Sequence, residues 1–337
     1  MRKFRNKKRT FIVFVLVILC IVNIYVSRNY IIMMPGIAKD LEGIIDVDRN
    51  GVFKDEKGSF LLITVSTRSA NLPLLIYSAV NPNTKIYNRT EIMPKNLNKK
   101  EYSNLTKEMM EESQMIAKAV ALKKMGYNIE IKSQGVKVLK VLNDSSAYKI
   151  LNEGDIILAL DGKEIKDTTH LLEEISKKRA GETVVLKIIR EGKEKLVTVK
   201  TMEYNQNDGK IGLGLYIKNH NVSTNLPVQI KIDVGDISGP SAGVMFALEI
   251  YNQLSNVDLT AGKIIAGTGT LAPDGSVGEV GGIVQKVITA HKNGAEIFFI
   301  PVGNYNDAEP VAQKYSITLV PIENFEDAVT YLESIID

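Results

Sequence analysis

The apolar and polar residues of this chain follow several patterns in succession. Residues 11–26, FIVFVLVILCIVNIYV, form an apolar run without a charged residue. Between about residues 34 and 98, apolar stretches such as SFLLITVSTRSA alternate with turn-rich segments such as VNPNTKIYN, which predicts strands. Over residues 104–124, apolar residues recur every three or four positions among charges, which predicts a helix. This helix either packs against a core or connects two domains.

Strands and helices alternate in the last third of the chain. From residue 211 on, the segments VQIKID, KIIAGTGTL, EIFFIP and ITLVPI are predicted strands. Helices are predicted from about Ser241 to Leu254, from Ile283 to Asn293 and from Phe325 onward. This alternation is typical of an α/β domain.

The apolar run near the N-terminus predicts a membrane-spanning helix. It is slightly shorter than the ~20 residues that cross a bilayer, but an untilted helix with flanking arginines that snorkel can span it. Basic residues precede it and should stay in the cytoplasm, which places residues from about Ser27 outside. A cleaved signal peptide is the alternative, although Tyr25 and Arg28 do not suit a small-x-small cleavage site.

Composition limits the chemistry available to the chain. Its 42 basic and 39 acidic residues leave a formal charge of +3, which argues against a nucleic-acid surface. The single cysteine, Cys20, lies inside the apolar run, where it is a poor nucleophile and has no disulfide partner. His220 and His291 have no second ligand at metal-binding spacing, and no P-loop motif occurs. We therefore expect no metal, no cofactor and no ATPase.

Residues 128–203 resemble a PDZ domain. The resemblance is carried by GVKVLKVL from Gly135, by SSAYKILNEGDIILALDGKEI from Ser145, by the helix-like THLLEEISKK and by the strand pair TVVLKIIREGKEKLVTVK. PDZ domains bind extended peptides by strand addition, so the resemblance implies a peptide ligand. It places the peptide edge at residues 135–141, opposite the helix around residues 170–175.

The residues expected to form this peptide groove are Gly135, Val136, Val138 and His170. The usual carboxylate-binding loop has a small-apolar-Gly-apolar run, whereas this chain has Ser133-Gln134-Gly135-Val136. A free C-terminus is therefore only one candidate ligand. His170 either contacts the ligand or is a surface histidine without a role.

The segment Gly239-Pro-Ser-Ala-Gly243 carries candidate nucleophile chemistry. Pro240 is tolerated at a helix start, which puts Ser241 in the first turn of the predicted helix. Small neighbours leave the hydroxyl uncovered, and the unbonded N–H groups of a helix start suit an oxyanion. The alternative is a helix start with a capping serine.

Lys286 carries candidate base chemistry in the segment Gly281-Gly-Ile-Val-Gln-Lys286. Its neighbours on the predicted helix are mostly apolar, which indicates partial desolvation. Desolvation disfavours the ammonium form and lowers the lysine pKa, as a base near neutral pH requires. A solvated surface lysine is the alternative.

Together, the GPSAG and GGIVQK motifs, in this order and separation, resemble the proteolytic domain of the Lon family. The resemblance implies a Ser-Lys dyad of Ser241 and Lys286, with Thr268 orienting the lysine. Backbone N–H groups near Gly239 to Ala242 would hold the oxyanion. Many family members have Asp directly before GPSAG, where this chain has Ser238.

The whole layout resembles the membrane-anchored PDZ-containing Lon-type peptidases of Gram-positive bacteria. We divide the chain into a cytoplasmic basic segment (1–9), an anchor (10–27), a β-rich membrane-proximal region with a connector helix (28–127), a PDZ domain (128–203) and an α/β (α+β) Lon-type domain (210–337). The predicted function is ATP-independent serine endopeptidase activity, outside the cytoplasm, on flexible or unfolded proteins. Ring formation, as a hexamer, is expected by analogy.

Three alternatives remain at this stage. One is a non-catalytic membrane scaffold, in which peptide binding is the function and the Lon-type fold is inert. Another is a protease that is inactive until a PDZ ligand binds. A signal peptidase, which also uses serine and lysine at membranes, lacks the paired motifs.

Overall fold

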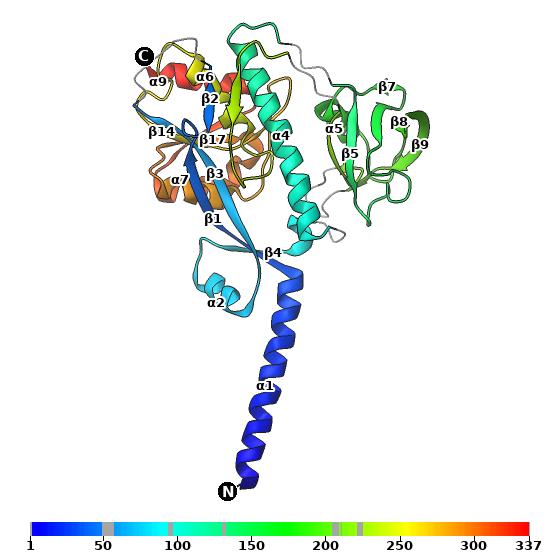
Figure 1. Ribbon diagram of the computed structural model, residues 1–337, viewed down its shortest axis with the longest axis vertical. Coiled ribbons are helices and arrows are strands. Elements are labelled where there is room, and N and C mark those ends of the chain that lie inside the picture. The colour runs from blue at the N-terminus through cyan, green and yellow to red at the C-terminus, as the bar shows by residue number, and fades with distance from the viewer. Residues whose placement is uncertain are drawn as a thin grey trace.

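The structure is a computed structural model that describes residues 2–48, 57–93, 97–129, 133–203, 209, 211–220 and 225–336, with the backbone alone for residues 2–10. The chain forms a long N-terminal helix, an α/β body and a separate β-rich unit (Figure 1). These parts agree with the expected mixed α/β fold class.

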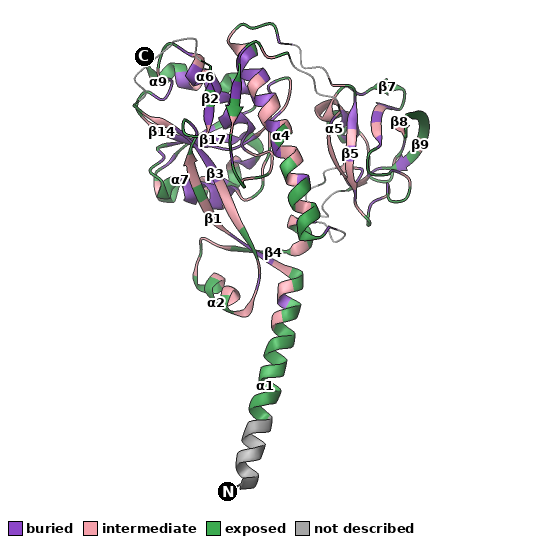
Figure 2. Cartoon of the chain, in the orientation of Figure 1, coloured by how far each residue is buried: buried purple, intermediate pink, exposed green. Residues whose placement is uncertain are grey.

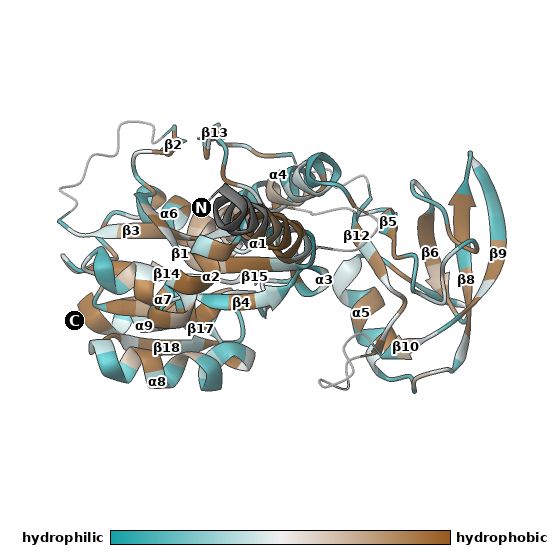
Figure 3. Ribbon diagram, turned by 90° about the horizontal axis from the view of Figure 1, so that it is seen from below, coloured by the Kyte–Doolittle hydropathy of each residue, from teal (hydrophilic) through white to brown (hydrophobic). Residues whose placement is uncertain are grey.

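Helix α1 (Arg2–Asn29) contains one segment, Phe11–Asn29, that is long and apolar enough to cross a membrane. Its apolar side chains are exposed along most of the helix (Figures 2 and 3). The helix passes directly into strand β1 (Tyr30–Asp40). Asn23 Oδ1 accepts a hydrogen bond of 3.0 Å from the Leu72 N–H at the start of α2 (Leu72–Val80), which ties the helix end to the body.

A six-stranded sheet forms the centre of the α/β body, in the order β18-β17-β14-β3-β1-β4. Four of its strands are parallel: β3 (Ser59–Ser69), β14 (Ile264–Gly267), β17 (Ile297–Pro301) and β18 (Thr318–Ile322). Strand β1 runs antiparallel to β3 and to β4 (Lys85–Asn88). Strands β1, β3 and β4 of the membrane-proximal region 28–127 therefore share one sheet with strands of the C-terminal region.

The physical reason is that β3 is buried on both faces. Phe60 and Leu62 point into one apolar core, and Leu61 and Ile63 into another. The first core is closed by α4 (Lys99–Lys124), α6 (Gly243–Leu254) and α9 (Phe325–Ile336), and the second by α7 (Ile283–Lys292) and α8 (Tyr305–Tyr315). A strand of this kind is stable only between two helical layers.

Helix α4 lies between the α/β body and the β-rich unit (Figure 1). It begins five residues earlier than the sequence pattern indicated, because the Asn98 side chain accepts the N–H groups of Lys100 and Glu101 in a capping box. Its residues Leu105 and Met109 pack with Leu139 and Tyr216 of the β-rich unit. The helix thus contacts both halves of the molecule.

The β-rich unit contains a sheet in the order β12-β5-β6-β8-β9, with α5 (Thr168–Ser176) packed on it. Its strands are β5 (Val136–Val141), β6 (Ile156–Leu160), β7 (Lys163–Glu164), β8 (Thr183–Arg190), β9 (Lys193–Lys200) and β12 (Leu215–Asn219). The short pair β10 (Met202–Glu203) and β11 (Ile211–Gly212) leads into β12. Strand β12 follows the other strands in the chain but lies at one end of the sheet.

Short elements complete the described part of the chain. Strand β2 (Ile45–Val47) pairs with β13 (Ile230–Ile232), and β15 (Thr270–Leu271) pairs with β16 (Val277–Gly278). Helix α3 (Arg89–Ile92) and the 3-10 turn η1 (Val302–Asn304) are single turns. The β15–β16 hairpin connects the strand that precedes Thr268 with the helix that carries Lys286.

Candidate active site

Ser241 lies in a turn directly before helix α6. The Gly243 N–H donates to the Pro240 carbonyl over 3.4 Å, Ala242 is the N-cap, and the helix begins at Gly243. Ser241 therefore lies just outside the helix. The sequence had placed it in the first turn, and this prediction is wrong. Gly239 has a φ of +97°, which glycine adopts without strain.

Lys286 reaches Ser241 from helix α7. Its Nζ atom lies 2.9 Å from Ser241 Oγ and 2.9 Å from Thr268 Oγ1, although these residues are 45 and 18 positions apart in the chain. The lysine is only 3% exposed. The structure thus brings together the three side chains that the sequence selected.

Thr268 follows strand β14 and fixes the backbone of the nucleophile. Its Oγ1 donates to the Ser241 carbonyl over 2.8 Å, and the Gly269 N–H donates to the same oxygen over 2.9 Å. Since the threonine proton is used in this bond, Thr268 can only accept from Lys286. An amine that donates one N–H to Thr268 keeps its lone pair for the serine hydroxyl.

Burial alone lowers the pKa of Lys286 from its ordinary 10.5 to about 7. The cause is desolvation, which penalises the ammonium form. No carboxylate of the described residues contributes to this shift. No acidic side chain therefore takes the place of the Asp that many Lon-type domains have before GPSAG, among the described residues. Ser238, at that position, contacts Thr106 Oγ1 at 3.1 Å, and Asp236 is exposed.

Two backbone N–H groups are available beside the Ser241 hydroxyl. The N–H of Gly239 is not one of them, since it donates to the Thr106 carbonyl over 2.9 Å, and this corrects the expectation that Gly239 contributes to an oxyanion site. Within the described residues, the N–H groups of Ser241 and Ala242 have no acceptor. They are the donors that remain for an oxyanion.

Helix α4 supports the loop that carries Ser241. Besides the bond from Gly239 to Thr106, Ser113 Oγ donates to the Pro240 carbonyl over 3.1 Å. A Cβ atom added at Gly243 would lie 2.9 Å from Ser113 Oγ, so the glycine permits this close approach. Sequence reasoning missed Ser113, although a serine between the apolar positions Met110 and Ile116 was a usable signal.

Strands β1 and β3 support the helix that carries Lys286. Thr289 Oγ1 on α7 accepts the Gly36 N–H over 3.1 Å. Gly282, the N-cap of α7, has a φ of +71°, and a Cβ there would lie 2.6 Å from Met33 Sδ and 2.9 Å from Val65. The second glycine of the GGIVQK motif is therefore required by packing as well as by backbone conformation.

The expected peptide edge in the β-rich unit is not free. Strand β5 is interior, because β12 pairs with it on one side and β6 on the other. Val136 and Val138 are fully buried in the core, and the Gly135 carbonyl accepts the His220 N–H over 2.8 Å. A ligand cannot add a strand to residues 135–141, so this prediction is wrong, although Gly135 does line a separate cavity of about 520 Å³.

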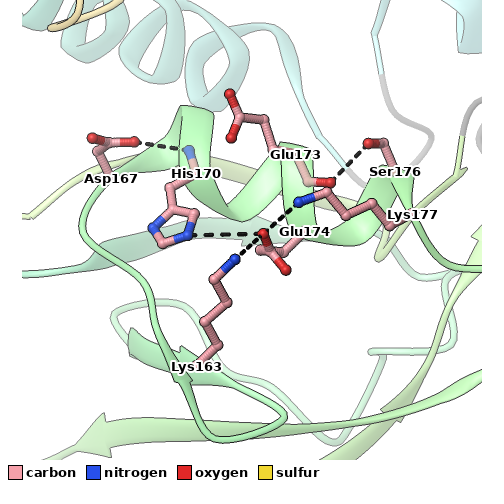
Figure 4. Close-up of polar contacts among 7 residues, drawn as sticks. All are labelled: Lys163, Asp167, His170, Glu173, Glu174, Ser176 and Lys177. Atoms are coloured by element: carbon pink, nitrogen blue, oxygen red, sulfur yellow. Dashed lines mark hydrogen bonds and ion pairs between the residues drawn. The ribbon is translucent and has the colours of Figure 1, made fainter.

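His170 belongs to a charged cluster and does not line the cavity beside α5 (Figure 4). Its Nε2 atom lies 3.9 Å from Glu174 Oε1, which also pairs with Lys163 at 2.5 Å and Lys177 at 2.7 Å. Asp167 caps the helix by accepting the His170 N–H over 2.8 Å. The structure therefore gives no support to a ligand contact by His170.

The edge of this sheet beside α5 is strand β12. It follows the run Gly212-Leu-Gly-Leu215, which is the small-apolar-Gly-apolar pattern that the sequence analysis sought near residue 133. Gly214 has a φ of +69°, and the N–H groups of Leu213 and Gly214 have no acceptor in the described part of the chain. The sequence analysis did not connect this run with the peptide edge, because β12 comes after all other strands of the unit in the chain.

A cavity of about 570 Å³ adjoins strand β12 and α5. Ile217 and Asn219 line it from β12, and Leu172 from α5. Other lining residues come from α4, from the β15–β16 hairpin and from the loop before Ser241, among them Ile116, Val277 and Pro240. The cavity therefore joins the β-rich unit to the immediate surroundings of the serine.

The fold and the Ser-Lys geometry define a class of protein: an α/β domain with a buried lysine beside a serine, joined to a β-rich unit. Residues 214–333 match the Lon protease (S16) C-terminal proteolytic domain, and residues 123–201 match the PDZ domain. The chain thus combines a PDZ domain with a Lon-type proteolytic domain, as the sequence resemblance had implied.

Curated relatives match part of the chain. The Lon protease of Dictyoglomus thermophilum is 32% identical over 154 residues, 42% of this chain and 19% of the relative. The Lon protease of Neorickettsia sennetsu is 30% identical over 95 residues, 28% of this chain and 11% of the relative. The chain spans less than a fifth of these relatives.

Solved structures match about a quarter of the chain. The PDZ domain of an SdrC-like protein from Listeria monocytogenes is 26% identical, covering 26% of this chain and 92% of that one, with a TM-score of 0.25.

Proposed function

We propose that the protein is a membrane-anchored serine endopeptidase that works without ATP and cleaves flexible or unfolded polypeptides. The observation that carries the proposal is the distance of 2.9 Å between Lys286 Nζ and Ser241 Oγ inside a buried site. The Lon-type domain match supports the same reaction class.

The first half of the reaction acylates the serine. Neutral Lys286 accepts the Ser241 proton while Oγ attacks the carbonyl carbon of the scissile peptide bond. The oxyanion faces the N–H groups of Ser241 and Ala242. The Lys286 ammonium then protonates the leaving nitrogen, the C–N bond breaks, and an ester to Ser241 remains.

The second half releases the acyl group with water. Lys286, neutral again, removes a proton from water, and the hydroxide oxygen attacks the ester carbon. Collapse of this intermediate breaks the bond to Oγ, and Lys286 returns the proton to Ser241. Thr268 keeps the amine oriented through both halves, since it accepts from Nζ and donates to the Ser241 carbonyl.

The PDZ domain and the first helix give this reaction its location and its substrates. The groove between β12 and α5, with the loop Gly212–Leu215 at one end, takes the peptide in place of the edge first expected at β5. Residues 11–29 anchor the enzyme, with the catalytic domain outside the cytoplasm. Protein substrates, peptide ligands and a homo-oligomer, expected as a hexamer, are the partners in this proposal.

The test is degradation of casein by the purified full-length chain in detergent, without nucleotide. Wild type should cut casein, whereas folded Ser241→Ala and Lys286→Ala variants should not. Lys292→Met is the matched control, because Lys292 lies exposed on the same helix. If all chains are inert on casein and on peptides, the scaffold function replaces the proposal.

The anchor and the assembly have separate tests. Membrane fractionation should find the full-length protein in the membrane and protease added to intact cells should digest its C-terminal domain. Sedimentation in detergent should give the mass of six chains.

A further inference from the structure

The free edge of strand β12 can pair with a peptide in only one direction when the peptide's carboxylate lies in the loop 212–215. The Gly214 carbonyl accepts the Leu142 N–H, and the His220 N–H donates to the Gly135 carbonyl, so both residues face β5. By alternation, the backbone groups of Leu215, Ile217 and Asn219 face the other way, toward a ligand. A peptide with its carboxylate in the loop 212–215 must extend toward Asn219, because the loop lies at the N-terminal end of β12.

The cavity of about 570 Å³ lies at the Asn219 end of this edge. Its walls are Leu172 of α5, Met109 and Ile116 of α4, and Leu271 and Val277 of the β15–β16 hairpin. These side chains make an apolar space, and Leu172, which lines it, is 54% exposed. The upstream residues of a bound peptide would therefore enter a space that the proteolytic domain helps to form.

Pro240 brings the far wall of this cavity next to the nucleophile. It lines the cavity and directly precedes Ser241 in the chain. Its carbonyl is held by Ser113 Oγ on α4 at 3.1 Å. The β12 edge and the residue before the serine therefore line one cavity, which also adjoins α4.

Glu112 occupies the junction between the β12 edge and the cavity. Its Oε1 atom accepts the Asn219 N–H over 2.8 Å, which is the bond that a peptide carbonyl would form there. The nearby Lys218 is paired with Glu108 at 2.8 Å. Burial raises the pKa of Glu112, and the bond from Asn219 opposes this rise, so the carboxylate is held by its contact with β12.

We propose that the cavity is a passage through which a polypeptide, bound by its free C-terminus at Gly212–Leu215, reaches Ser241, and that Glu112 selects the residue at the junction. This inference rests on the proposed peptidase function. The ligand is an extended polypeptide with an apolar C-terminal residue. A segment that passes Asn219 replaces Glu112 at the N–H, and the carboxylates of Glu112 and Glu173 disfavour an acidic residue at that point.

The experiment uses the full-length chain and fluorogenic peptides that share one sequence and end in a free carboxylate or an amide. We expect the amide to lower kcat/KM at least tenfold, mainly through KM, since the loop then loses the charged ligand. Among free-acid peptides, those with Asp at the fifth position from the C-terminus, opposite Asn219, should be cleaved more slowly than those with Lys there. Glu112→Gln should remove most of this difference.

Glu111→Gln is the matched control, because Glu111 is the exposed neighbour on the same helix, and it should keep the Asp-to-Lys difference. Equal kcat/KM for acid and amide, with casein cleavage that still depends on Ser241 and Lys286, would overturn the passage and leave the peptidase intact. An unchanged preference in Glu112→Gln would overturn the role of Glu112. Failure to cut casein as well as peptides would instead refute the peptidase.

Discussion

The rate of acylation should depend on pH through Lys286. A base must be neutral, and burial places the pKa of this lysine at about 7. The neutral fraction is then about one tenth at pH 6 and about nine tenths at pH 8. An ordinary lysine with a pKa of 10.5 would be neutral in only about one molecule in 3000 at pH 7. The difference between the two pKa values corresponds to a cost of about 5 kcal/mol for the ammonium form relative to the neutral amine in the buried site.

The assay is kcat/KM for one fluorogenic peptide without titratable side chains, measured between pH 5.5 and 9.5. We expect a rise of about tenfold per pH value below 7, half of the maximum near pH 7, and a plateau above pH 8. Lys286→Arg should be inactive at every pH, because a guanidinium stays charged. The exposed control Lys292→Met should reproduce the wild-type profile.

Two results would refute this reasoning. A rate that stays constant from pH 8 down to pH 5.5 would show that no group with a pKa near 7 acts as the base. A midpoint near pH 10 would show that the lysine is solvated, contrary to its exposure of 3%. Circular dichroism at each pH separates these outcomes from unfolding.

Three further predictions concern the groups around the dyad. Thr268→Val should lower kcat by roughly 10- to 100-fold with the fold intact, and Thr268→Ser should restore most of the activity, because only the hydroxyl contacts Lys286 and the Ser241 carbonyl. Lys286→Met should raise the free energy of unfolding by roughly 2 kcal/mol or more at pH 7, measured in urea, because the unfolded chain keeps the proton up to pH 10.5 whereas the folded chain loses it above about 7. This gain should shrink as the pH rises toward 10.5, and a variant less stable than wild type at pH 7 would contradict the desolvation argument. Gly282→Ala should destabilise the protein by about 2 kcal/mol or more, whereas Gly281→Ala, with nothing within 4 Å of its added Cβ, should be nearly neutral; equal Tm values for the two would refute the packing argument.

The meeting of Ser241 and Lys286 could be predicted from sequence because their motifs are local. GPSAG and GGIVQK each fix a turn and a helix start within six residues, and the distance between Ser241 and Lys286 follows from where those starts meet. The apolar neighbours of Lys286 also indicated its burial correctly. The role of α4 in holding Pro240 and Gly239 is a tertiary contact over more than 120 residues, which no local pattern records.

The PDZ groove was misplaced for a different reason. The resemblance placed the peptide edge at residues 135–141, opposite the helix around residues 170–175. The strand that lies there, β12, comes last and falls within the segment that matches the Lon-type domain. Strand β12 pairs in the sheet of the β-rich unit, yet the division of the chain assigned it to the Lon-type domain. Similarly, the segment near residue 60 was predicted correctly as a strand, but one of its two partner strands, β14, lies about 200 residues further along the chain.

That pairing determines when the candidate site can form. Strand β3 needs β14 beside it, and the pairing of Ser59 with Ile264 closes a loop of about 200 residues. Contacts of such long range form slowly and cannot form before the later segment has been synthesised. Because α7 packs on β1 and β3, the helix that carries Lys286 contacts strands that are synthesised more than 200 residues earlier. The candidate site can therefore form only when the last third of the chain folds back onto its first strands.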